Sequence, residues 1–248
     1  MEIYVGTSGY GYKEWQGIFY PPKTSPKEML RFYAERLRAV EINNTFYHMP
    51  TEPVLLSWAE QVPDAFVFAI KAPQIITHLK RLRDVGGETE YLFRTLSTLG
   101  RKLGPVLFQF PPNFRADRPR LEDFLALLPG HFSGAFEFRS PSWLAVEILD
   151  LLRERGHSLC IADTDENPAD EIINTAPCGY LRLRRSDYTE ADLSQWLERI
   201  LAQEWQKAFV FFKHEGEARG PEMAIRFREL ADSEAKRIQD RKDNSISN

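Results

Sequence analysis

Charged and amide side chains occur at alternate positions inside segments that otherwise look like buried strands. These segments read Val40-Glu41-Ile42-Asn43, Phe136-Glu137-Phe138-Arg139 and Leu181-Arg182-Leu183-Arg184. Because successive side chains of a strand point to opposite faces, the polar residues of each segment share one face. A charge inside a buried strand is costly unless it is paired or hydrated, so these residues indicate a common polar site.

Other apolar segments carry polar residues near their C-terminal ends. Counted along the chain, Lys71 ends the third segment, Gln109 lies in the fourth and Asp163 follows the sixth, while Lys213 and His214 end the eighth. The apolar residues between them must pack against covering helices, so we expect the polar set to point into a shared interior. The candidate catalytic residues are Glu41, Lys71, Glu137 and Asp163.

The loops after these segments add residues that could bind a ligand. The turn Gly6–Tyr10 could hold an anion with its backbone N–H groups, or it could simply be a tight turn. Trp15 and Trp143 could stack on a ring or cap the core, and His78 could equally be a solvated surface histidine. The candidate binding residues are Thr7, Ser8, Tyr10, Trp15, Asn43, Tyr47, His78, Gln109, Arg139, Trp143, Arg182, Arg184, Lys213 and His214.

Eight short apolar segments alternate along the chain with amphipathic segments. Eight strand-then-helix units in series predict an α/β protein with a parallel sheet, and eight strands close into a single (β/α)8 TIM-type barrel. An open doubly wound sheet is the main alternative. The predicted strands cover residues 3–6, 40–43, 66–71, 106–110, 135–138, 158–162, 180–184 and 209–213.

Helix ends are marked by capping residues. Ser25-Pro26-Lys27-Glu28 predicts a capping box with proline at the first helical position, and Thr189-Glu190-Ala191-Asp192 is a looser version of it. Gly156 and Gly104 are expected to end the helices before the sixth and fourth strands.

The length and composition fit one globular domain. The 248 residues, 43% hydrophobic and 27% charged, match the roughly 250 residues of one α/β barrel. We expect the barrel to occupy residues 1–232 and a polar C-terminal tail to occupy 233–248. Such a core needs no disulfide, metal or other cofactor to hold it, and the sequence leaves the oligomeric state open.

The net charge and the lack of targeting signals limit the expected partners and location of the protein. The net charge of −4 and the pI near 5.8 disfavour general binding to nucleic acid, although a local basic pocket remains compatible with it. Cys160 and Cys178 lie among apolar residues, as buried reduced thiols do. The chain starts directly with a strand and has no apolar run of about 18 residues, so we expect a cytoplasmic protein without a membrane segment.

The order of these motifs resembles the DUF72 (YecE-like) family from residue 3 to about residue 230. The resemblance implies an irregular TIM barrel and supports the choice of site, but it implies no reaction, because the family's activity is unassigned. The motifs are Gly6-Thr7-Ser8-Gly9-Tyr10, Trp15, Gly17-Ile18-Phe19-Tyr20-Pro21, Val40-Glu41-Ile42-Asn43, Thr45-Phe46-Tyr47, Lys71-Ala72-Pro73, Ile76-Thr77-His78, Leu103-Gly104-Pro105, Phe108-Gln109-Phe110-Pro111-Pro112, Glu137-Phe138-Arg139 and Ser142-Trp143.

The last two strands depart from the pattern of many members. Where those carry a His-Gly pair after the arginine of the seventh strand, this chain has Arg184-Arg185. Where many end the eighth strand with asparagines, this chain has Lys213-His214-Glu215. Roles assigned to these two strands therefore depend on the present sequence alone.

The balance of residues favours binding of an anion. Lysines and arginines outnumber the acids, and fixed cations at a poorly hydrated mouth bind phosphate or carboxylate groups. We therefore expect a hydrolase, lyase or isomerase acting on an anionic small molecule, such as a phosphorylated or carboxylated sugar. Arg139, Arg184 and Lys213 would hold the anion, and Glu137 or Asp163 would act as acid or base.

Several alternatives stay open. Glu41 and Glu137 could serve glycoside hydrolysis, or Lys71 could form a Schiff base. Glu41, Glu137, Asp163, His78 or His214 could bind a divalent metal, although no ligand spacing indicates one. A non-catalytic module for nucleic-acid ends or flipped bases, and a purely structural salt-bridge network in the interior, are the remaining interpretations.

Overall fold

The fold is a closed barrel of eight parallel strands, paired in chain order from β1 to β8 and back to β1. A computed structural model describes residues 1–130, 132–213 and 216–246. All eight predicted strands are confirmed, with ends that shift by a few residues. The strands are β1 (Glu2–Ser8), β2 (Ala39–Ile42), β3 (Val67–Lys71), β4 (Leu103–Gln109), β5 (Gly134–Glu137), β6 (Ser158–Asp163), β7 (Cys178–Leu183) and β8 (Lys207–Phe212).

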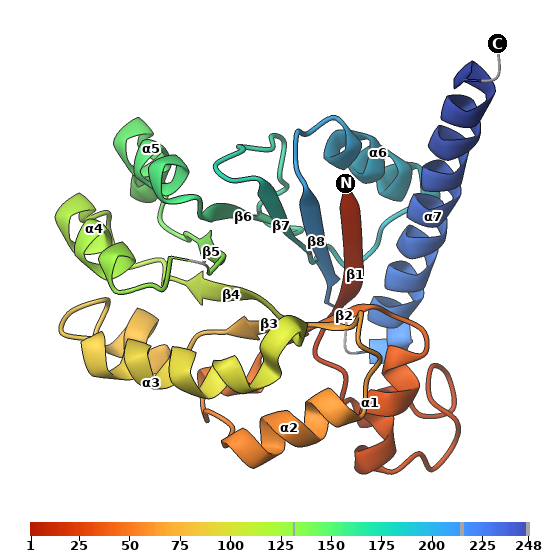
Figure 1. Ribbon diagram of the computed structural model, residues 1–248, viewed down its shortest axis with the longest axis horizontal. Helices are drawn as coiled ribbons and strands as arrows, with labels where there is room; N and C mark the ends of the chain where they lie inside the picture. Colours follow the sequence, from red (N-terminus) through yellow and green to blue (C-terminus); the bar gives the residue numbers. More distant parts are fainter. Residues whose placement is uncertain (131, 214–215, 247–248) are drawn as a thin grey trace.

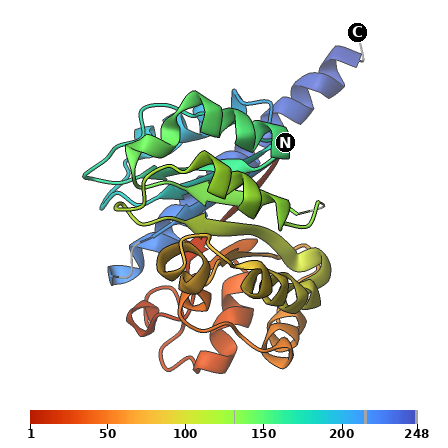
Figure 2. The same cartoon turned by 90° about the vertical axis from the view of Figure 1, so that its left-hand side faces the viewer.

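Helices cover the outside of the strands (Figures 1 and 2). The connection between β6 and β7 contains no α-helix, which makes the barrel irregular. The α-helices are α1 (Pro26–Ala34), α2 (Glu52–Glu60), α3 (Gly86–Leu96), α4 (Arg118–Ala126), α5 (Val146–Arg155), α6 (Glu190–Leu201) and α7 (Arg219–Ile246).

The helix signals in the sequence are largely confirmed. Ser25 with Glu28 and Thr189 with Asp192 both form capping boxes. Gly156 ends α5 in the left-handed conformation at φ 68°, where a residue without Cβ is favoured. The prediction for Gly104 is wrong, because this residue lies inside β4, where an added Cβ would approach Val67 Cγ1 to 2.5 Å. Close contact between β3 and β4, and not a helix end, explains that glycine.

The barrel interior is layered. Small and aromatic side chains fill its lower part, among them Ala39, Ala69, Ala135, Tyr180 and Phe211, which form one buried cluster. The alternation of the strands then places charged residues two positions further along, towards the C-terminal ends. The apolar side chains of the opposite parity pack under the helices in a second, larger cluster. The charged residues therefore lie on top of a buried, mostly apolar layer that fills the N-terminal part of the barrel interior.

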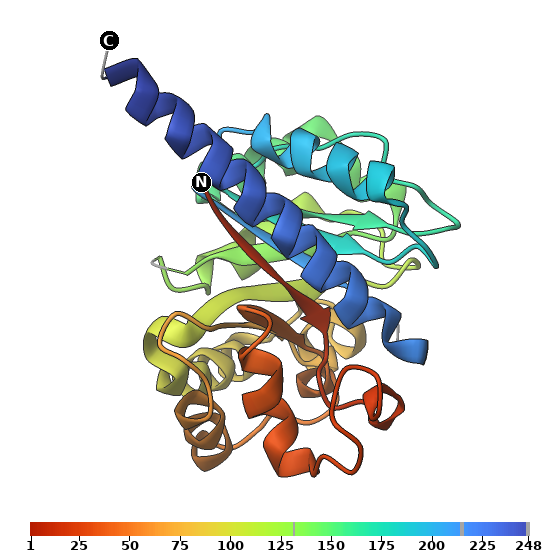
Figure 3. The same cartoon turned by 90° about the vertical axis from the view of Figure 1, so that its right-hand side faces the viewer.

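Helix α7 closes the barrel from outside. It lies along β1, and its C-terminal end projects beyond the barrel (Figure 3). Met223, Ala224 and Phe227 of its first half are buried. The helix continues without a break through the polar segment that begins at Ser233. Among the described residues, no helix combines the length and the apolar character needed to cross a membrane.

Candidate active site at the barrel mouth

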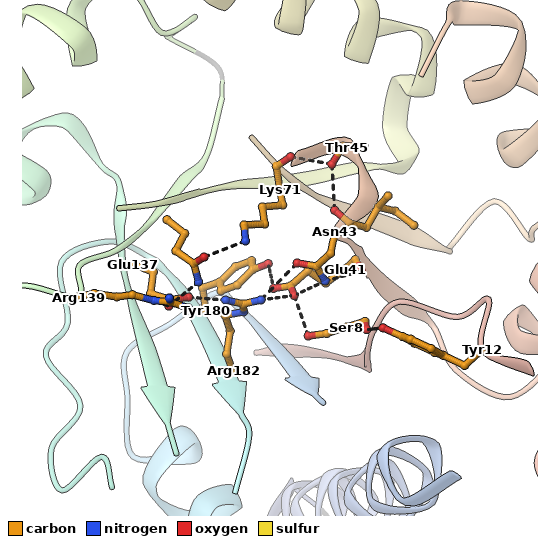
Figure 4. Close-up of polar contacts among 12 residues, drawn as sticks. Ser8, Tyr12, Glu41, Asn43, Thr45, Lys71, Glu137, Arg139, Tyr180 and Arg182 are labelled. Atoms are coloured by element: carbon orange, nitrogen blue, oxygen red, sulfur yellow. Dashed lines mark hydrogen bonds and ion pairs between the residues drawn. The ribbon is translucent and has the colours of Figure 1, made fainter. Parts of the chain in front are cut away.

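Arg182 of β7 lies between two carboxylates in the interior (Figure 4). Its guanidinium donates to Glu41 Oε1 of β2 at 2.8 Å and, through its other terminal nitrogen, to Glu137 Oε2 of β5. Arg182 and Glu41 are fully buried, and Glu137 is nearly so. Three strands thus contribute one charged residue each to a single buried cluster, as the alternating pattern predicted.

The carboxylate of Glu41 accepts four hydrogen bonds. Besides Arg182, Glu41 Oε1 accepts from Ser8 Oγ at 2.7 Å and from Asn43 Nδ2 at 2.9 Å. Glu41 Oε2 accepts from the Tyr180 hydroxyl at 2.8 Å. Tyr180 was not among the candidates, although its position two residues before Arg182 places it on the same face. Glu41 is therefore fixed in place, and its side chain is fully buried.

A second chain of hydrogen bonds leads from Glu137 to Lys71. Gln109 Nε2 donates to Glu137 Oε1 at 2.6 Å, and Lys71 Nζ donates to Gln109 Oε1 at 2.8 Å. Arg139 Nε lies 3.2 Å from Glu137 Oε1, and 44% of its side chain is exposed. Lys71, Gln109 and Glu137 come from the adjacent strands β3, β4 and β5, so neighbouring strand ends make a polar row.

The cations keep both glutamates ionised. Burial by itself would raise their pKa values, but Arg182, Arg184 and the hydrogen bonds outweigh it and lower the pKa of Glu41 and of Glu137 to about 2. A carboxyl that is always ionised is a poor proton donor. In this structure the two glutamates balance the charge of Arg182.

Lys71 lies in a different electrostatic environment. Within the described residues it forms no ion pair, and its ammonium lies over the Phe46 ring, 4.2 Å from the centroid. Burial, together with the charge of Arg182, lowers the pKa of Lys71 to about 8. The neutral amine is thus accessible near neutral pH. A lysine of this kind is suited to proton transfer or nucleophilic attack.

His78 stands beside Lys71 across the same phenylalanine. It lies in a π-helical turn (Ile75–Leu79) that follows β3. Its ring is 4.8 Å from that of Phe46, and its Nδ1 is 2.8 Å from Thr77 Oγ1. Burial and the neighbouring Lys71 lower the pKa of His78 to about 4, so the imidazole is neutral at pH 7. A neutral imidazole has one nitrogen that accepts a hydrogen bond and one N–H group that donates one.

Arg184 adds a further cation beyond the end of β7. Burial and the repulsion from Arg182 lower its pKa, and its Nε is buried without a hydrogen-bond partner among the described residues. Four cations, Lys71, Arg139, Arg182 and Arg184, thus accompany two carboxylates. These six residues together carry a net positive charge in a protein whose total charge is −4.

Two candidates face the wrong way. Asp163 pairs with Leu183 in the sheet, one position out of phase with Arg182, so it points towards the covering layer. There it accepts from Arg185 Nε at 2.9 Å and from the Tyr188 hydroxyl at 2.7 Å. Thr7 is likewise out of phase with Ser8, and its amide and hydroxyl bond the Tyr33 hydroxyl. Both residues stabilise loops and lie outside the charged cluster.

For the two tryptophans, the structure supports the second of the two alternatives, a place in the core. Trp15 is 1% exposed and packs against Tyr12, Phe19 and Tyr20, so it caps the core. Trp143 is fully buried, and its indole nitrogen donates to the backbone of the β4–α4 loop. Neither ring is available for stacking on a ligand in this structure.

The other loop candidates lie at varying distances from the cluster. Tyr47 is 66% exposed and contacts Phe46. Tyr10 is half-buried and lines a cavity of about 350 Å³ beside the β1 and β2 ends. Lys213 follows β8 and is half-buried. His214 lies outside the described residues. Of the residues near Lys71, Phe46 was missed, because an apolar ring gives no chemical signal in a sequence.

The three carboxylates that were candidate metal ligands form ion pairs with arginines. Glu41 and Glu137 bind Arg182, and Asp163 binds Arg185 and Tyr188. Within the part of the chain that the structure describes, no group of three histidine, cysteine or acidic residues is arranged to hold a metal ion.

Comparisons with known proteins agree with this architecture. A DUF72 family protein of Thermotoga maritima MSB8 has a crystal structure that superposes with a TM-score of 0.82 at 26% identity, covering 94% of this chain and all of that one. A D-psicose 3-epimerase of Clostridium cellulolyticum H10, solved with D-tagatose, superposes with a TM-score of 0.60 at 8% identity and covers 94% and 99% of the two chains. The second likeness concerns the fold alone.

Sequence comparison identifies the family. The protein YecE of Escherichia coli K12 is 35% identical over 145 residues, which are 58% of this chain and 50% of that protein. The match therefore spans about half the length of this curated relative. The sequence profile of a family described as a protein of unknown function, DUF72, matches residues 4–246. The chain belongs to the DUF72 family and has a TIM-barrel fold.

Proposed function

We propose that the protein is an enzyme that binds an anionic small molecule at the C-terminal mouth of the barrel and uses Lys71 as its reactive group. Active sites of TIM barrels lie at this end of the strands. One observation carries the proposal: among the described residues, four cations from three strands surround two carboxylates, and Arg184 Nε has no partner there. A phosphate or carboxylate group of a substrate would supply the missing negative charge.

The roles follow from the contacts. Arg184 and the partly exposed Arg139 would hold the anionic group, as arginines do with planar or tetrahedral oxyanions. Lys71 and the neutral His78 would transfer protons near the reacting carbon. Glu41 and Glu137 keep Arg182 in place and are assigned no proton transfer. The sequence favoured Glu137 or Asp163 as the acid or base. A pKa of about 2 makes Glu137 both a poor proton donor and a weak base, and Asp163 pairs with Arg185 outside the cluster.

Thermal unfolding with simple oxyanions tests the binding part of the proposal. Phosphate, sulfate and citrate should raise the midpoint relative to sodium chloride of equal ionic strength. A ligand at about 100 times its Kd stabilises the folded state by about 2.7 kcal/mol. Arg184→Gln should remove most of the shift. Arg118→Gln is the matched control, since Arg118 lies on the surface of α4 and its ion pair there is with Glu122.

The proposal is wrong if no oxyanion stabilises the protein beyond sodium chloride. It is equally wrong if Arg184→Gln and Arg118→Gln lose the shift to the same extent. A purely structural charge network would produce the first of these results, because it needs no further anion.

A groove beside the mouth favours phosphate-backbone binding as a second candidate function. It has a volume of about 940 Å³ and lies between the loops that follow β3 and β4, and the basic residues on its walls outnumber the two aspartates there. Its basic residues are Lys80, Arg81, Arg83, Arg115 and Arg120. Binding to single-stranded DNA should then weaken steeply as salt rises. The absence of such binding at low salt would leave the small-molecule function alone.

A further inference from the structure

We infer that the Lys71 amine forms a covalent imine with the carbonyl carbon of its anionic substrate, which makes that substrate an anionic ketone or aldehyde. The inference deepens the proposed function and rests on it. It concerns the substrate class and the reaction step at one atom, which the anion site by itself leaves undefined.

The position of the amine supports covalent chemistry. Lys71 is the last residue of β3, and its Nζ reaches the polar row at the mouth. Its hydrogen-bond acceptor there is the neutral amide oxygen of Gln109, while the nearby carboxylates of Glu41 and Glu137 are engaged by Arg182. An ion-paired lysine would be held as ammonium, but an amide acceptor stabilises the charged form far less.

The surroundings favour the nucleophilic form. Lysines become nucleophiles when they are desolvated or lie near another cation, and Lys71 meets both conditions through its burial and through Arg182 and Arg184. With the pKa near 8, about one tenth of the amine is neutral at pH 7. A fully solvated lysine would be neutral in fewer than about one molecule in a thousand.

The step balances with groups that are present. The lone pair of neutral Nζ attacks the carbonyl carbon, and the π electrons of the C=O bond move to oxygen. One proton passes from nitrogen to that oxygen, giving a carbinolamine. Its hydroxyl takes up a second proton and leaves as water while the nitrogen lone pair forms the C=N bond. The resulting iminium then loses its N–H proton, which restores the proton that was consumed and leaves the imine. His78, neutral and next to the same Phe46 ring, is placed to carry the proton. Arg184 holds the anionic group.

Reductive trapping tests the step. The protein is incubated at pH 8 with dihydroxyacetone phosphate or pyruvate and reduced with sodium borohydride. The alcohols glycerol 3-phosphate and lactate serve as matched ligands without a carbonyl. A trapped imine adds the mass of the carbonyl probe less one oxygen atom, and peptide mapping locates it. We expect modification of Lys71 with at least one carbonyl probe and none with either alcohol.

Variants separate the site from background reactivity. Lys71→Arg keeps a positive charge but cannot form an imine, so it should abolish the adduct. Lys207→Arg, at the opposite end of the barrel, should leave it unchanged. Peptide mapping of the unmodified sequence gives the same information if Lys71→Arg does not fold. The initial rate of adduct formation on Lys71 should rise about tenfold per pH unit below pH 8, because the neutral amine is the attacking species.

The outcomes distinguish this inference from the proposed function. Failure to trap either carbonyl probe on Lys71 overturns the imine, even if oxyanions and both alcohols stabilise the protein, and the anion site then stands. Adducts spread equally over surface lysines also overturn it. Loss of oxyanion stabilisation with no adduct overturns both. If a carbonyl probe is trapped on Lys71 and glycerol 3-phosphate or lactate reduces that trapping by competition, both the imine and the anion site are supported.

Discussion

At the scale of single residues, the buried cluster depends on one arginine. Arg182 compensates two carboxylates that are removed from water, and each of those carboxylates is oriented by neighbours on adjacent strands. Breaking a buried ion pair from one side costs more than the pair contributes, because a charge is left without compensation. The three residues are therefore energetically coupled, and substitution effects at them will not be additive.

Replacing Arg182 should destabilise the fold strongly. Arg182→Met leaves Glu41 and Glu137 buried without their cation, and we expect a loss of about 4 kcal/mol in the free energy of unfolding at pH 7. Arg182→Lys should lose less, because it keeps the charge. Urea unfolding measures both. Arg118→Met, which breaks an exposed pair, should change the value by less than about 1 kcal/mol. Equal effects at the two arginines would contradict the coupling.

The cluster also predicts how stability depends on pH. The pKa values of Glu41 and Glu137 are about 2 in the folded protein and 4.5 in an unperturbed chain, so the unfolded state binds protons first on acidification. Their stabilising contribution is fully present above about pH 5 and is lost as the pH falls towards 2. Urea unfolding between pH 6 and 3 should show this decline. Arg182→Met should show a much smaller decline, because both carboxyls then bind protons in the folded state too.

Lys71 should titrate about two pH units below an ordinary lysine. The rate at which a limiting amount of acetic anhydride modifies Lys71, followed by mass spectrometry, should show a midpoint near pH 8. Arg184→Gln removes a neighbouring cation and should raise the midpoint, whereas Arg118→Gln should not. A midpoint above pH 10 in the unmodified protein would remove the basis for a neutral amine near pH 7.

At the scale of elements, the alternation of side chains along each strand decided which residues meet in the barrel interior. The period of two placed Glu41, Glu137 and Arg182 each on the interior face of its own strand, and on that ground they were predicted to share a site. The register of the sheet brings the three side chains together. Asp163 was included although the same rule excludes it, because Ala162, and not Asp163, is in phase with Arg182. One residue of phase turns this carboxylate to the other side of the sheet. The alternation must therefore be followed through to the last residue of each strand.

Helix ends allow a sharper test of local sequence. Gly156 ends α5 at φ 68°, a conformation that costs an alanine about 1 kcal/mol. Gly156→Ala should lower the free energy of unfolding by about this amount. Gly156→Asn should lower it by less, because asparagine tolerates the left-handed region. Since an added Cβ would meet no atom within 4 Å, the loss comes from the backbone alone. Identical losses for the two variants would argue against that explanation.

At the scale of the whole molecule, β1 and β8 must pair to close the barrel, and α7 covers this closure. Phe227 of α7 is fully buried and contacts Phe212 of β8. Phe227→Ala should therefore cost about 3–4 kcal/mol in urea unfolding. Arg237→Ala, on the exposed part of the same helix, should cost less than about 0.5 kcal/mol. A small effect at Phe227 would mean that α7 contributes little to closure.

The sequence by itself determined the eight strands, the barrel class, most helix caps and the polar face of three strands. These follow from local periodicity and capping, in which each signal lies within a few residues of its effect. It could not show that Trp15 and Trp143 are buried, that Asp163 binds Arg185, or that Tyr180 and Phe46 border the cluster. Those contacts join residues far apart in the chain.

Only the tertiary structure decided how the candidate residues are ionised. In the sequence, Glu41, Lys71, Glu137 and Asp163 were all candidate catalytic residues, with Glu137 or Asp163 expected to be the acid or base. In the barrel, Arg182 keeps the two glutamates ionised, while Lys71 has an amide for its acceptor and a lowered pKa. Protonation depends on burial and on charges within a few ångströms, and these are set when distant strands come together, not by the order of residues along the chain.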